Sequence, residues 1–223
     1  MPRDEYQQAL DDLRADVLGM GETVIDQFDR GLDAVETGDE SLAREVIDGD
    51  AAVNDRYLAL EGDCVDLLAL QQPVAGDLRF VTASFKILTD LERVGDLATN
   101  LADYSLSAAD RRLEPVDVAT IGEVAREQLT AALEAYAEAD AEAARAVAAR
   151  DDDLDALCQR ASERVVRDLI EDGAGADAWA VERVMDDVSR VLLTVRDLER
   201  VGDHAVNTAA RTLYMVESDP ELI

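Results

Sequence analysis

The sequence is poor in the residues that build most enzyme sites. It has one histidine, two cysteines and one tryptophan, and aromatic residues make up only 4% of its 223 positions. No stretch approaches the roughly 18 uncharged apolar residues that would suggest a membrane-spanning helix. The first residues also lack the apolar core of a signal peptide. We therefore expect a cytoplasmic protein that does not insert into a membrane.

Positive charge is scarce as well. The chain has 51 acidic residues against 21 basic ones, a formal net charge of -30, and Lys86 is its only lysine. Repulsion of this size weakens a compact fold in dilute buffer, but molar salt shortens the screening length to about 3 Å. The composition therefore predicts a halophilic source such as a haloarchaeon. It also argues against nucleic acid or anionic lipid as a direct partner.

The residues that are abundant favour helices. Apolar residues make up 48% of the chain, and most of them are Ala, Leu and Val. Patterning and turn residues predict six helices, at about 4–37, 39–71, 77–108, 116–139, 140–171 and 177–217. Asp39, Asp140 and Asp177 stand where a helix N-cap is expected. Helices of this length need long partners, so we expect antiparallel bundles.

An internal duplication is the strongest signal in the sequence. Residues 90–100 read DLERVGDLATN, and residues 197–207 read DLERVGDHAVN, so nine of eleven positions are identical. Weaker repetition extends toward the N-terminal end of each copy. The duplication predicts an all-α fold of two tandem antiparallel three-helix bundles, comprising residues 1–110 and 111–223.

Two pairs of unusual residues follow from this alignment. Gly95 and Gly202 fall in the middle of predicted helices, where glycine is unfavourable, so we expect a neighbouring helix to approach closely there. Cys64 and Cys158 do not occupy equivalent positions, which argues against a duplicated disulfide or cysteine metal site. We expect two reduced, buried thiols.

Each copy also contains acidic side chains one helical turn apart, which places them on one face of a helix. The spacing occurs in the repeated motif and again earlier in each copy, and an asparagine continues the line in the motif. Such oxygen-rich lines on two helices suit a hard cation. The candidate ligands are Asp50, Asn54, Glu92, Asp96, Asn100, Asp151, Asp155, Glu199, Asp203 and Asn207.

Two alternatives to a non-catalytic metal site remain open from the residues alone. Arg93 and Arg200 could neutralise Asp96 and Asp203 through i,i+3 pairs, which would make these faces the solvated surface of a metal-free helical adaptor. A carboxylate-metal hydrolase or oxidase is the other. If metal binds, all-oxygen ligands favour Mg, Mn or Fe, and Zn less well.

Catalysis has little support in the sequence. Ferritin-like di-iron oxidases need histidines on two helices, and His204 is the only histidine. Because the first copy has Leu97 at the equivalent position, we expect His204 to pack or to support a ligand rather than to bind metal. No nucleophile and base pair and no phosphate-cradling glycine loop stands out. We expect a protein that is not an enzyme.

These motifs together resemble the PhoU family of phosphate-transport regulators over nearly the whole chain. The resemblance includes the Gln72-Pro73 turn, Asp77-Leu78-Arg79, and the Glu-Arg-hydrophobic-Gly-Asp segments of the duplicated motif. It implies paired three-helix bundles with metal ions held on their surface by the acidic motifs. It also implies negative regulation of phosphate uptake through the ATPase subunit of the phosphate ABC transporter and, where one exists, a phosphate-sensing kinase. We expect a homodimer as well.

The sequence departs from the family pattern at two places. Asn54 replaces a carboxylate in the first copy, so we expect its site to bind metal more weakly than the second. The second copy lacks the Gln-Pro turn and has the loop Gly173-Ala174-Gly175 instead.

Overall fold

The computed structural model describes residues 3–71, 74–107, 117–172 and 178–219. Within these ranges the chain forms helices and no strand. None of the described helices is long and apolar enough to span a bilayer. The helices are α1 (Arg3–Thr37), α2 (Glu40–Gln71), α3 (Ala75–Leu106), α4 (Val118–Glu138), α5 (Ala141–Ala149), α6 (Asp151–Asp172) and α7 (Ala178–Glu217).

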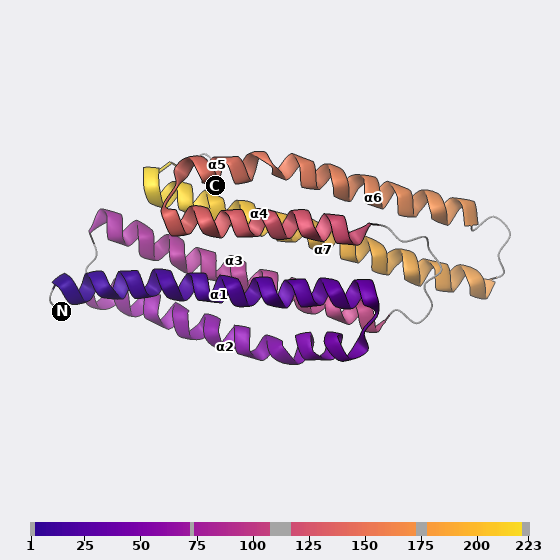
Figure 1. Cartoon of the computed structure of the whole chain (residues 1–223), viewed down its shortest axis with the longest axis horizontal. Helices are drawn as coiled ribbons and strands as arrows, with labels where there is room; N and C mark the ends of the chain where they lie inside the picture. Colours follow the sequence, from indigo (N-terminus) through magenta and orange to yellow (C-terminus); the bar gives the residue numbers. More distant parts are fainter. Residues whose placement is uncertain (1–2, 72–73, 108–116, 173–177, 220–223) are drawn as a thin grey trace.

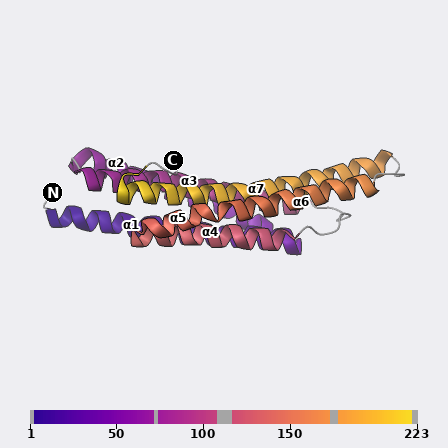
Figure 2. The same cartoon turned by 90° about the horizontal axis from the view of Figure 1, so that it is seen from above.

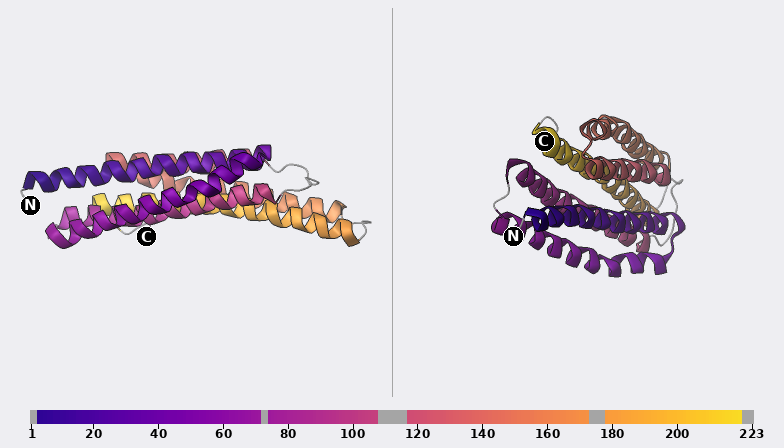
Figure 3. Two further views of the ribbon diagram at one scale, coloured as in Figure 1. Left: turned by 90° about the horizontal axis from the view of Figure 1, so that it is seen from below. Right: turned by 60° about the vertical axis from the view of Figure 1, so that its left-hand side comes forward.

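The helices form two antiparallel bundles that lie side by side along an elongated molecule (Figures 1 and 2). In the first bundle α1, α2 and α3 pack on one another, and in the second α7 packs on α4, α5 and α6. Contacts between α3 and α7, and between α1 and α4, join the bundles (Figure 3). The expected tandem bundles are confirmed. The main apolar core runs through both bundles and includes residues of each repeat, and a small second cluster lies within the first bundle.

The turn between the first two helices has the same design in both repeats. Gly38 follows α1 with φ 70°, and Ala139 follows α4 with φ 52°, so in both repeats the backbone turns through the left-handed region. Asp39 Oδ1 then accepts the backbone N–H groups of Ser41 and Leu42. Asp140 Oδ1 caps α5 in the same way. Both predicted N-caps are therefore confirmed, whereas the one predicted at Asp177 lies outside the described residues.

The single helix predicted over 140–171 is wrong, because the chain forms two helices there. Arg150 ends α5, and α6 begins directly after it at Asp151. The run Asp151-Asp152-Asp153 explains the break, since aspartates favour a first helical turn over a helix interior. In the first repeat the positions that correspond to this aspartate run are Asp50, Ala51 and Ala52, with one aspartate instead of three. There α2 continues through the region as one helix.

Both cysteines are buried and free, as expected.

The contact between α1 and α4 is anchored by Arg14. Its Nη1 donates to the carbonyl oxygens of Tyr136 and Ala137 at the end of α4, at 3.2 and 2.9 Å. The guanidinium also lies over the stacked rings of Phe80 and Tyr136. This contact satisfies helix-end carbonyls of one repeat with a side chain of the other.

A reciprocal set of hydrogen bonds joins α3 to α7. The Asp197 carboxylate of α7 is fully buried. Its Oδ2 accepts hydrogen bonds from Asn100 Nδ2 and Tyr104 Oη of α3, at 3.2 and 2.9 Å. In the opposite direction Asp90 Oδ1 of α3 lies 2.9 Å from His204 Nδ1 and accepts a bond from Asn207 Nδ2 at 3.3 Å. The first and last residues of each motif copy therefore bind the last and first residues of the other. We call these contacts the inter-repeat clasp.

Burial makes Asp197 the more important half of the inter-repeat clasp. Changing Asp197 to Ala leaves the Asn100 amide and the Tyr104 hydroxyl without their acceptor, and we expect it to lower the free energy of unfolding by about 3 kcal/mol. The matched change Asp90→Ala should lower it by roughly 1 kcal/mol, because that side chain is partly exposed to water. Urea unfolding of the two variants measures the difference, and equal losses would contradict this ranking.

Candidate metal sites

Four carboxylates of the second repeat lie close enough to repel one another. Asp151 and Asp155 come from α6, and Glu199 and Asp203 come from α7. Burial raises the pKa of the Glu199 carboxyl above its ordinary value of 4.5, and Asp155, Asp203 and Asp151 raise it further. The structure thus brings together the four residues that the sequence analysis named as candidate ligands in this repeat, and their role as ligands stays a prediction.

The same repulsion acts on two other members of the cluster. Burial and then Asp151 raise the pKa of Asp203, while His204 and Arg200 lower it. Burial, Asp151 and Asp203 raise the pKa of Asp155. Arg200 forms its ion pair with Asp197 at 3.7 Å rather than with Asp203, so the i,i+3 pair that belongs to the metal-free alternative is not formed in this repeat. The cluster thus carries more negative charge than its neighbours neutralise.

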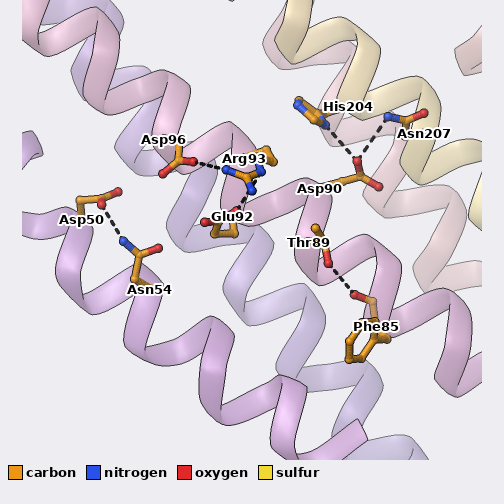
Figure 4. A network of polar contacts seen from close by, with 10 residues as sticks. All are labelled: Asp50, Asn54, Phe85, Thr89, Asp90, Glu92, Arg93, Asp96, His204 and Asn207. Carbon is orange, nitrogen blue, oxygen red and sulfur yellow. Dashed lines mark hydrogen bonds and ion pairs between the residues drawn. The ribbon is translucent and has the colours of Figure 1, made fainter. Parts of the chain in front are cut away.

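The first repeat neutralises its acidic line internally. Arg93 lies 3.0 Å from Asp96 and 3.4 Å from Glu92, so the i,i+3 pair that belongs to the metal-free alternative is formed in this repeat (Figure 4). Burial raises the pKa of Glu92 above 4.5, Asp96 and Asp50 raise it further, and Arg93 and His204 lower it. The Arg93 guanidinium therefore occupies the position of a counter-ion between the two carboxylates.

Asp50 has also lost much of its capacity to bind a cation. Its Oδ2 accepts a hydrogen bond from Asn54 Nδ2 at 2.8 Å, and its Oδ1 accepts bonds from Gln27 Nε2 and Thr99 Oγ1, at 3.3 and 3.2 Å. Figure 4 shows Asp50 and Asn54 side by side on α2, facing Glu92 and Asp96 of α3. Three neutral donors thus satisfy the carboxylate that would face a metal in this repeat.

Asn100, Asn207 and His204 are engaged with the other repeat rather than with the acidic clusters. Asn100 and Asn207 donate their amide groups to Asp197 and Asp90 in the inter-repeat clasp. His204 contacts Asp90. Figure 4 shows the Asp90 side chain of α3 turned toward α7, whereas Glu92 on the same helix faces α2. The roles predicted for Asn100 and Asn207 as metal ligands stay predictions, but their side chains already have another function.

The mid-helix glycines permit the close approach that the sequence predicted. A Cβ atom added to Gly95 would lie 3.3 Å from both Gln27 Oε1 and Val53 Cγ1. One added to Gly202 would overlap the side chain of Leu154 and lie 3.3 Å from Gln128 Oε1. Gly95 therefore lets α1 and α2 pack closely against the acidic motif of α3, and Gly202 lets α4 and α6 pack closely against that of α7.

The second repeat fits a hard cation better than the first does. It supplies four oxygen-donor carboxylates, and among the described residues none of the four is in an ion pair, although Arg200 and His204 lower the pKa of Asp203 from a distance. The Gln128 Oε1 atom beside them is buried without a hydrogen-bond partner in the described part of the chain. Among the described residues, however, no three His, Cys, Asp or Glu side chains are already arranged as a ligand set. Binding would require the carboxylates to turn toward one another.

A pocket of about 260 Å³ opens between the repeats beside the first acidic line. It is lined by residues of α3 and by Arg200 of α7. Arg93 and Arg200, which are equivalent in the two motif copies, both reach it. Because Asp96 also lines the pocket, the first candidate site and the inter-repeat interface share a surface.

A family profile matches both repeats of the chain. The sequence profile described as "PhoU domain" matches residues 17–105 and again residues 118–212. This chain belongs to the PhoU family.

Relatives of the PhoU family resemble the chain over almost its full length. A protein of Pseudomonas aeruginosa named "Phosphate-specific transport system accessory protein PhoU homolog" is 32% identical over 215 residues, which is 95% of this chain and 85% of that protein. The crystal structure of PhoU from the same species has a TM-score of 0.87 at 31% identity, and the match covers 96% of this chain and all of that one. The Streptococcus pneumoniae structure described as "the phosphate transport system regulatory protein PhoU" has a TM-score of 0.86 at 26% identity, with 96% and 98% covered.

Sequence reasoning missed several residues of these sites. Gln27, Gln128 and Thr99 contact the acidic clusters, while Asp90 and Asp197 organise the inter-repeat clasp. The two glutamines were detectable, because they occupy equivalent positions in the two copies. Asp90 and Asp197 were also detectable as the first residue of each motif copy, but nothing local indicated that their partners lie in the other repeat.

The raised carboxyl pKa values of the second repeat predict how the stability of the protein depends on pH. A carboxyl whose pKa is higher in the folded than in the unfolded state favours folding when protonated, so stability falls as pH rises through that interval. In metal-free protein Glu199→Gln should therefore raise the melting temperature at pH 7 and raise it much less near pH 4. Thermal unfolding across this range measures the effect. Asp55→Asn, an equal charge change at an exposed position outside the cluster, serves as the control; the same gain in both variants would assign the effect to net charge alone.

Proposed function

We propose that this protein is a metal-binding negative regulator of phosphate uptake that acts in the cytoplasm. In this proposal it binds the ATPase subunit of the phosphate ABC transporter when phosphate is plentiful and, where one exists, a phosphate-sensing kinase. It functions as a homodimer and is adapted to molar salt. Family membership carries the proposal, since a relative of similar length and sequence is named as an accessory protein of phosphate transport.

The chemistry of the chain supports regulation by contact rather than catalysis. His204 is the only histidine, and its Nδ1 is engaged with Asp90 inside the protein. General acid and base catalysis and nucleophile activation most often use histidine, and here no second one is present. The relatives described above are named as accessory or regulatory proteins. We therefore assign no reaction to the protein.

Carboxylate repulsion in the second repeat supports the metal part of the proposal. A hard cation, Mg, Mn, Fe or, less favourably, Zn, would supply the positive charge that Asp151, Asp155, Glu199 and Asp203 lack. In the first repeat Asp50, Glu92 and Asp96 already have Arg93 and neutral donors as partners. We therefore propose that the second repeat holds its cation more tightly.

A metal-free helical adaptor is the second candidate. It is favoured by the first repeat, where Arg93 neutralises the acidic line, and by the lack of a preformed ligand set among the described side chains. Partner binding would then depend on the helix surfaces alone. Bound metal in protein purified without chelator distinguishes the two candidates.

The metal proposal predicts a loss confined to one repeat. Replacing Glu199 and Asp203 with Ala removes two of the four oxygen donors, so we expect the tighter of two binding events to disappear from a Mn²⁺ titration. The equivalent change of Glu92 and Asp96 should abolish only the weaker event. Elemental analysis of the same preparations gives an independent measurement. Unchanged metal content in the Glu199/Asp203 variant would refute this assignment of ligands.

The regulatory proposal predicts a phenotype for gene deletion. A strain without the protein should take up more phosphate than its parent in phosphate-rich medium, because the transporter is no longer restrained. Uptake of labelled phosphate measures this, and a pull-down with the full-length protein should recover the transporter ATPase. Normal uptake in a deletion strain that has no second copy of the gene would count against the proposal.

A further inference from the structure

A buried glutamine supports the acidic cluster in each repeat. Gln27 of α1 donates its Nε2 to Asp50 Oδ1 at 3.3 Å, and Gln128 of α4 donates to Asp151 Oδ1 at 3.0 Å. Both residues are buried: Gln27 is 5% exposed and Gln128 is 1% exposed. The two glutamines occupy equivalent positions in the duplication. The contact of α1 with the Asp50 carboxylate of α2 is therefore repeated by the contact of α4 with the Asp151 carboxylate of α6.

Each glutamine also has an oxygen atom without a partner. Gln27 Oε1 and Gln128 Oε1 are buried and accept no hydrogen bond in the part of the chain that the structure describes. Gln128 Oε1 and Asp151 Oδ1 lie 3.3 and 3.4 Å from the point that a Cβ on Gly202 would occupy, so both oxygens lie next to the acidic motif of α7. A buried carbonyl oxygen without a donor is unfavourable, and here it occurs twice at one position of the duplicated fold.

The two repeats differ in how much their carboxylate depends on the glutamine. Asp50 keeps hydrogen bonds from Thr99 and Asn54 in addition to the one from Gln27. In the second repeat Thr99 is replaced by Val206, and Asn54 is replaced by Asp155, which repels Asp151 rather than donating to it. Gln128 is therefore the one hydrogen-bond donor to Asp151 among the described residues.

We propose that Gln128 is a positioning residue of the cation site in the second repeat, and that this is its principal role. Its Nε2 holds Asp151 in place, and its Oε1 is available to accept a hydrogen bond from a water molecule on the cation. An amide can perform both tasks at once, whereas a glutamate would add a fifth negative charge to the cluster. Gln27 keeps the equivalent position, but Asp50 depends on it less, because Asn54 donates to Asp50 as well and the Thr99 hydroxyl, which also faces Gly95 O, lies within hydrogen-bond distance. The inference rests on the cation binding proposed above.

The test compares the same substitution in the two repeats of the full-length protein. Mn²⁺ titration followed by electron paramagnetic resonance measures the affinity of each site, and thermal unfolding without metal measures stability. Gln128→Met should weaken the tighter site by about 10- to 100-fold, the range found when a group supporting a metal ligand is lost. Gln27→Met should leave the affinity of the first site close to that of the original protein, while both variants lose similar stability.

The first repeat also supplies the design of a rescue. Adding Val206→Thr to Gln128→Met places a hydroxyl where Thr99 donates to Asp50, and it should recover part of the lost Mn²⁺ affinity. Gln128→Asn, which keeps the amide but is one methylene shorter, provides a second variant if Gln128→Met does not fold. It should also bind Mn²⁺ more weakly.

Three results would overturn the proposal. Unchanged Mn²⁺ affinity in folded Gln128→Met or Gln128→Asn would reduce the glutamine to a packing residue, while the proposed metal function would stand. Equal losses of affinity in the Gln27 and Gln128 variants would contradict the difference between the repeats. If the unaltered protein binds no Mn²⁺, Mg²⁺, Zn²⁺ or iron, the proposed cation site fails and the role of Gln128 fails with it.

Discussion

A fully buried carboxylate has to be hydrogen-bonded in the folded protein, and the neutral donors to Asp197 come from the other repeat. This requirement ties α7 to one position along α3, because a shift of either helix would leave Asn100 and Tyr104 without their acceptor. The partner contact at Asp90 imposes the same register from the opposite direction. Once these helices are fixed, Glu92 and Asp96 face α2, and Glu199 and Asp203 face α6. The interface between the repeats thus determines where each acidic line points.

The two repeats use one scaffold for different electrostatic environments. The first sets Arg93 and the neutral donors Asn54 and Thr99 against its carboxylates, although the pKa of Glu92 stays raised and Gln27 Oε1 has no donor among the described residues. The second has Asp155 and Val206 at the positions of Asn54 and Thr99, and its carboxyl pKa values are raised by mutual repulsion. A duplication therefore does not produce two equal sites. Divergence at a few positions gives one repeat internal partners for its carboxylates and leaves the other in need of positive charge.

This division is compatible with a protein that acts by contact. The first repeat shares a pocket with the inter-repeat interface through Asp96 and Arg93, so its charges are part of the surface that joins the bundles. A cation in the second repeat would change the charge of a half-exposed face of α6 and α7, and such a change alters how a surface attracts or repels a partner. If the protein works in molar salt, as proposed above, such electrostatic contacts act over only a few ångströms, which favours a partner that docks closely.

The sequence by itself determined the helical class, the duplication, the N-caps at Asp39 and Asp140, and the sharing of each acidic region by two helices. These features are local or periodic, because i,i+4 spacing places residues on one face and an aspartate before a helix accepts its first N–H groups. The prediction of one helix over 140–171 was wrong, because the apolar pattern is continuous there. The break between α5 and α6 is indicated only by the aspartate run after Arg150. Tertiary structure alone decided that Asn100 and Asn207 bind the other repeat and that Gln128 holds Asp151. These contacts join residues far apart in the chain, and no spacing along one helix can encode which helix lies opposite.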